Sequence, residues 1–192
     1  MEFEKILSDK CKSVIDSWRE NDIYAISFLI YSNMGETFEN VENFPEFSIG
    51  YNTERFCGKA PKISEERWNY AFWSQNNQVI ISADNNEMSR HLIDWYQEIG
   101  IENPGLTLEN EYDEDFNYVG KGPGGYYELL MLVSRVARKL QEDGTIKSRF
   151  GEIPIIVHDL EYSWYCKNAT VEANPNGQAS DFITALDEVI NG

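Results

Sequence analysis

The sequence has few cysteines, and the three it has form no paired pattern. Cys11, Cys57 and Cys166 are separated by long and unequal intervals. A small domain held by disulfides needs an even and closely spaced set, so the sequence does not belong to that class. An odd and sparse set is typical of a reducing compartment, and we therefore expect a cytoplasmic protein.

Long apolar runs are also missing. The longest lies near Tyr24 to Tyr31, whereas a membrane-spanning helix needs about 20 apolar residues. The first residues, Met1 to Lys5, are mostly acidic or apolar, whereas a secretion signal has a basic start followed by an apolar core. We expect neither a membrane span nor a secretion signal.

Basic side chains are scarce relative to acidic ones. The 192 residues include 33 acidic and 16 basic side chains, which gives a formal net charge of −17. Such a charge repels the phosphates of nucleic acids and anionic membranes, and it attracts basic proteins. We therefore expect no nucleic-acid partner and no membrane partner, and a basic protein is the partner that the charge favours.

Metal and cofactor patterns are absent. The sequence has only two histidines, His91 and His158, and Cys166 follows the second without another Cys or His pair to complete a metal site. No serine lies in the context of a nucleophile elbow. We expect no metal and no cofactor.

The hydrophobic content of 42% is in the range of folded globular proteins, and the length favours a single domain over residues 1–192. Helical and β periodicities are mixed along the chain without strict alternation. This favours an α+β fold, with a small mixed β-sheet of about four to six strands packed with several amphipathic helices. We expect helices near 3–18, 64–68, 86–99, 129–140, 160–171 and 182–190, and strands at 23–31, 47–51, 79–82 and 153–158.

The segment Arg67 to Ser74 concentrates aromatic side chains, with Trp68 and Trp73 at its two ends. It is either a junction in the core or an exposed aromatic surface flanked by Arg67. We predict that both tryptophans are buried and bridge the sheet to the helices. We also predict that the almost continuously apolar strand Ile23 to Tyr31 is an interior strand, covered on both faces.

Two features favour an enzymatic alternative. The glycine-rich segment Gly120 to Gly125 precedes a predicted helix, where anions bind readily, although it matches neither the phosphate-loop pattern nor the dinucleotide pattern. His158 ends a predicted strand and is followed by Asp159 and Glu161. Asp159 is also a candidate cap for the next helix. If a site exists here, His158 must lie in a pocket within reach of one of these acids.

An acidic run spans Glu109 to Asp115, and its last three residues are Asp113, Glu114 and Asp115. The run lacks the glycine and the spacing of a calcium-binding loop. It is either a solvated loop or a surface for a basic partner, with these three residues and Arg67 as candidate partner-binding residues. Further acids lie between Glu36 and Glu46 and at Glu142-Asp143.

Several short motifs occur in a recognisable order. They are Tyr51-Asn52-Thr53-Glu54, Arg67-Trp68 with Ala71 and Trp73, Leu140 to Gly144, Ile155-Ile156-Val157 and Asn174-Pro175. This order resembles the bacterial family described as domain of unknown function 4303. The sequence departs from that pattern at His158-Asp159-Leu160-Glu161, where small acidic residues are expected. The resemblance implies a function like that of related bacterial domains, namely an immunity protein, which inhibits a toxin.

Three functions follow as hypotheses. The first is a protein-binding module, and in particular an immunity-type inhibitor of a basic toxin. The second is an enzyme with a site near His158, Asp159 and the Gly120–Gly125 loop. The third is a structural or regulatory interaction module.

Overall fold

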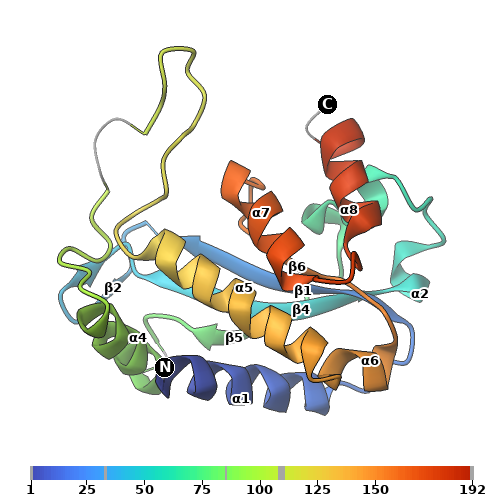
Figure 1. The fold of residues 1–192 in the computed structure, drawn as a ribbon, viewed down its shortest axis with the longest axis horizontal. Helices are drawn as coiled ribbons and strands as arrows, with labels where there is room; N and C mark the ends of the chain where they lie inside the picture. Colours follow the sequence, from blue (N-terminus) through green and yellow to red (C-terminus); the bar gives the residue numbers. More distant parts are fainter. Residues whose placement is uncertain (1, 33, 85, 108–110, 191–192) are drawn as a thin grey trace.

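The computed structural model describes residues 2–32, 34–84, 86–107 and 111–190. These residues form a mixed four-stranded sheet covered by helices, and a small separate hairpin (Figure 1). The predicted α+β class is confirmed.

The strands are β1 (Ile23–Ser32), β2 (Thr37–Phe38), β3 (Val41–Glu42), β4 (Pro45–Thr53), β5 (Gln78–Ile81) and β6 (Ile155–His158). The helices are α1 (Glu2–Ser17), α2 (Glu54–Cys57), α3 (Glu65–Trp68), α4 (Asn86–Glu98), α5 (Tyr126–Glu142), α6 (Thr145–Phe150), α7 (Trp164–Ala173), α8 (Ser180–Ala185) and the short η1 (Tyr70–Phe72) and η2 (Leu186–Ile190).

The strand order of the sheet is β5-β4-β1-β6. β4 runs antiparallel to β1, while β6 runs parallel to it. Phe28 of β1 lies opposite Ile49 on one side and Val157 on the other. The prediction that residues 23–31 form an interior strand is therefore confirmed.

The continuous apolar run of β1 follows from burial on both faces of the sheet. Ile26, Phe28 and Ile30 face the larger core, where α1, α4, α5 and α7 pack. Ala25 and Leu29 face a second core formed with the aromatic segment 68–73 and α8. A strand with two buried faces has no solvent side on which polar residues could alternate.

The aromatic segment is a junction of the core, as one of its two interpretations predicted. Trp68 and Trp73 are 3% and 4% exposed. The Trp68 ring contacts Tyr24 of β1 at 5.6 Å and Phe182 of α8 at 5.9 Å, both edge to face. The sheet and the C-terminal helix are thus joined through one indole, and the exposed aromatic surface is excluded for these two rings.

The free edge of β6 is covered by side chains of α7. Thr170 exchanges two hydrogen bonds with the backbone of Val157, both 3.0 Å. Asn174 accepts from the N–H of Ile155 at 2.9 Å and donates to its carbonyl at 2.7 Å. These bonds take the place of a further strand, so the edge strand leaves no open backbone ladder on which another chain could pair.

Two expectations need correction or completion. The helix predicted from Leu160 begins only at Trp164, because Tyr162 adopts a left-handed conformation with φ 52° that a helix cannot include. Residues 37–42, for which no strand was predicted, form the β2–β3 hairpin. By residue type, Asn85 and Asn86 are both candidate caps for α4, and Asn85 lies outside the described residues.

Candidate functional site

A hollow lies beyond the carboxyl ends of β1 and β6. Its volume is about 550 Å³, which is within the range of small-ligand sites. Parallel strands place their carboxyl ends at one edge of a sheet, and ligands collect at that edge. In Figure 1 a long loop, coloured yellow-green and preceding α5, rises above this edge. We call the hollow the groove and residues 111–122 the projecting loop.

The groove is lined by side chains that come from five separate stretches of the chain. Five of them are aromatic, and two are glutamates. They are Ser32, Met34, Asn43, Thr107, Glu111, Tyr112, Tyr118, Gly122, Pro123, Tyr126, Glu161, Ser163, Trp164 and Tyr165.

Two buried tyrosines fix one side of the groove. Tyr126, at the start of α5, donates a hydrogen bond to the Ile30 carbonyl at 2.8 Å. Tyr165, on the first turn of α7, donates to Asp159 Oδ2 at 3.2 Å. Burial raises the pKa of both phenols, so both are neutral at physiological pH. This side of the groove is therefore preorganised.

The projecting loop forms the other side and is folded on itself. Tyr112 and Tyr118 form an isolated β-bridge. Asp113 closes the turn between them, since its Oδ1 accepts from the N–H groups of Asp115 and Asn117 at 2.9 Å. These bonds, led by those from Asn117, lower the pKa of the Asp113 carboxyl. At the base, Tyr118 accepts from Gly122 N–H at 3.0 Å.

The predicted acidic run therefore forms the tip of the projecting loop, and Asp113, Glu114 and Asp115 are all exposed. Glu109, at the start of the run, lies outside the described residues. The cluster between Glu36 and Glu46 lies near the groove, since Asn43 lines it and donates to the Gly105 carbonyl at 3.0 Å. Glu142 is the last of the 17 residues of α5 and Asp143 follows it, so both lie about 25 Å from the start of that helix.

The prediction of a pocket at His158 is wrong. The residue is 1% exposed and is packed between the rings of Tyr70 and Tyr162, at 4.9 and 5.4 Å. Its Nδ1 lies 2.8 Å from the Asp159 carbonyl oxygen and its Nε2 2.8 Å from Ser27 Oγ. Burial lowers the pKa of His158 to about 4. The imidazole is thus a neutral component of the core.

Asp159 does not cap a helix, as was predicted, but stabilises a turn. Its Oδ1 accepts from the N–H groups of Glu161 at 3.0 Å and Ser163 at 3.1 Å. It thereby holds the turn that carries Glu161 and Trp164 to the groove. His158 and Asp159 do not face each other through their side chains, because the contact to His158 uses the Asp159 backbone.

The glycine-rich segment reaches the groove, since Gly122 and Pro123 line it. Two of its glycines are explained by packing. A Cβ at Gly125, where φ is 84°, would lie 2.7 Å from the Tyr96 ring, and one at Gly124 would lie 2.3 Å from the Asn103 carbonyl oxygen. These approaches account for the glycines without a bound phosphate.

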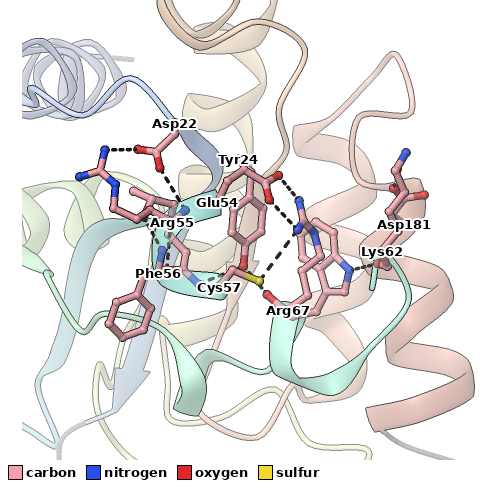
Figure 2. Close-up of polar contacts among 12 residues, drawn as sticks. Asp22, Tyr24, Glu54, Arg55, Phe56, Cys57, Lys62, Arg67 and Asp181 are labelled. Atoms are coloured by element: carbon pink, nitrogen blue, oxygen red, sulfur yellow. Dashed lines mark hydrogen bonds and ion pairs between the residues drawn. The ribbon is translucent and has the colours of Figure 1, made fainter. Parts of the chain in front are cut away.

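Arg67 lies in a different place from the acidic tip. Figure 2 shows its guanidinium held by the Glu54 carboxylate, with hydrogen bonds of 2.5 and 3.0 Å, and lying beside Cys57 Sγ. The same guanidinium lies 4.0 Å from the centre of the Tyr24 ring. With 11% of its side chain exposed, Arg67 joins α2 and α3 to the sheet and does not extend a surface shared with Asp113.

The sequence did not single out the groove, because its lining converges only after folding. Glu161 was considered only as a partner of His158, and Glu111 only as one member of the acidic run. One signal was available: Tyr112, Phe116 and Tyr118 alternate with acids in a segment that has no core periodicity.

Within the described ranges, no group of three His, Cys, Asp or Glu side chains could hold a metal ion. None of the described helices is long and apolar enough to span a membrane.

Comparisons with protein-family models, with curated proteins and with solved structures find no match for this chain. The resemblance to domain of unknown function 4303, and the immunity-type function it implies, remain hypotheses.

Proposed function

We propose that this protein is a cytoplasmic protein-binding module that binds a basic protein, as an immunity-type inhibitor of a basic toxin would. The observation that carries the proposal is the projecting loop. Its tip bears exposed acids, and Tyr112, Phe116 and Val119 are 62%, 86% and 49% exposed. Large apolar side chains gathered on one exposed segment are typical of an interaction surface.

The charge of the chain supports a basic partner. A net charge of −17 creates a field that steers a positively charged protein and raises its association rate. The acids at the loop tip meet such a partner first, because the loop extends beyond the body of the fold (Figure 1). Proteins that act on nucleic acids carry the basic surface that this mode of binding needs. Nucleic acids themselves are repelled by the same field.

The test of this proposal is a pull-down from the native host, followed by kinetics with the partner recovered. We expect a basic partner whose binding weakens as salt is added. The variant Glu114→Gln with Asp115→Asn should lower the association rate several-fold, with little change in the dissociation rate, because rim charges act mainly on encounter. Asp113 stays unchanged because its carboxylate holds the turn.

A matched control is Asp94→Asn with Glu98→Gln on α4. Both residues are exposed, and in the described part of the chain neither side chain makes a hydrogen bond or ion pair. This pair changes the net charge by the same amount at another place. If both pairs alter the association rate equally, the loop has no special part in binding. Recovery of only neutral or acidic partners, with binding independent of salt, contradicts the proposal.

A further inference from the structure

We infer that the groove binds an arginine side chain of the basic partner; this inference rests on the proposed function. The chemistry of the lining indicates the ligand. Aromatic rings attract cations over their faces, and Tyr112 and Trp164 are 62% and 43% exposed beside the groove. Two carboxylates, Glu111 and Glu161, complete a lining that suits a flat cation.

Both carboxylates are free to pair. Among the described residues, the side chains of Glu111 and Glu161 make no hydrogen bond or ion pair. The cation of the same loop, Lys121, has its ammonium 4.7 Å from the centre of the Tyr127 ring, and it does not line the groove. The lining therefore carries two negative charges, and no basic residue of the described lining neutralises them.

The aromatic side of the groove is fixed before any ligand arrives. Tyr126 and Tyr165 use their hydroxyls within the protein, and Trp164 donates from Nε1 to the Gly120 carbonyl at 3.0 Å. The last bond ties the projecting loop to α7. A preorganised site loses less conformational entropy on binding.

The protein itself contains an example of the same recognition. Arg67 lies over the Tyr24 ring and pairs with both oxygens of Glu54 (Figure 2). A guanidinium is planar, stacks on rings and pairs with carboxylates through two parallel hydrogen bonds, whereas an ammonium is a strongly hydrated point charge. The groove combines several aromatic rings with two carboxylates. Because a guanidinium can both stack on rings and pair with carboxylates, the groove favours arginine over lysine.

The test uses three N-acetylated, amidated tripeptides, Gly-Xaa-Gly, in which the central residue is arginine, citrulline or lysine. Binding is followed by amide chemical shifts of the full chain. We expect the arginine peptide to shift resonances of groove residues, the lysine peptide to bind more weakly and the neutral citrulline peptide to lose about tenfold or more in affinity, as loss of a charge-assisted hydrogen bond does. Citrulline or lysine binding as tightly as arginine overturns the inference.

The paired variants are Glu111→Gln with Glu161→Gln, and the α4 pair Asp94→Asn with Glu98→Gln. The first pair should lower arginine affinity about tenfold or more, while its amide spectrum stays that of a folded protein. The second pair removes the same charge from residues that do not line the groove, so it should leave arginine affinity within about twofold. Equal loss in both pairs overturns the inference. Failure of the pull-down with arginine binding intact contradicts only the proposed function.

Discussion

At the scale of single residues, His158 shows how burial turns a candidate catalytic group into a structural one. Because a carbonyl oxygen only accepts, the bond to Asp159 places the proton on Nδ1, and Nε2 then accepts from the Ser27 hydroxyl. A second proton would bring a charge into a site enclosed by two tyrosine rings. Burial disfavours that charged form, and this is the cause of the lowered pKa.

This predicts a pH dependence of stability. The folded pKa of about 4 lies below the ordinary value of 6.5, so the unfolded chain binds the proton more readily. The stabilisation is complete above pH 6.5 and is lost as the pH falls towards 4, by on the order of 3 kcal/mol. Urea unfolding of the native protein and of His158→Gln across this range measures it. The native curve should fall more steeply than that of the variant, and parallel curves would refute the assignment.

At the scale of elements, hydrogen bonds from side chains at α7 attach this helix to β6, the edge strand of the sheet. Asn174 is 3% exposed, and its side chain also accepts from Gln141 Nε2 at 3.0 Å. Removal of the amide leaves the buried N–H and C=O groups of Ile155 without partners. Such groups each cost about 1–3 kcal/mol when they stay unsatisfied.

We therefore predict that Asn174→Ala lowers the free energy of unfolding by about 2–4 kcal/mol. The Ile155 amide should also exchange faster with solvent, because the edge of the sheet opens. The control is Asn168→Ala on the same helix, whose side chain is exposed and which should change stability by less than about 0.5 kcal/mol. Equal losses in the two variants would show that the edge bonds add nothing to stability.

The elements also show what a sequence can predict. β1 was predicted from its almost continuous apolar run and α5 from apolar positions at the helical period, and both are local properties of the sequence. The start of α7 was mistaken because Asp159 has the identity of a helix cap, while its carboxylate binds the turn at Glu161 and Ser163. The groove could not be predicted, because the convergence of Glu111, Trp164 and their neighbours depends on the sheet order.

At the scale of the whole molecule, the net charge of −17 acts in two opposite directions. Like charges repel one another and destabilise the compact state, while the same charges attract a basic partner. Salt screens both effects. We predict that raising the sodium chloride concentration from about 0.05 M to about 0.5 M increases the melting temperature. The same change should weaken partner binding.

Differential scanning calorimetry and binding kinetics over one salt series measure the two responses. A melting temperature that stays constant or falls would mean that attractive pairs such as Arg67–Glu54 outweigh the repulsion. A protein without excess charge would show neither trend, so the opposite signs are specific to this charge distribution.

The parallel pairing of β6 with β1 has a consequence for the order in which the molecule assembles. Ile26 pairs with Ile155, so the two strands meet only when most of the chain between them has been gathered. Contacts of such wide separation form late in folding. On the ribosome, the projecting loop is therefore made well before β6, which completes the edge that the loop overhangs. The lining that we infer to bind arginine is assembled only when β6 and the residues after it have joined the fold, so an unfinished chain lacks the complete groove.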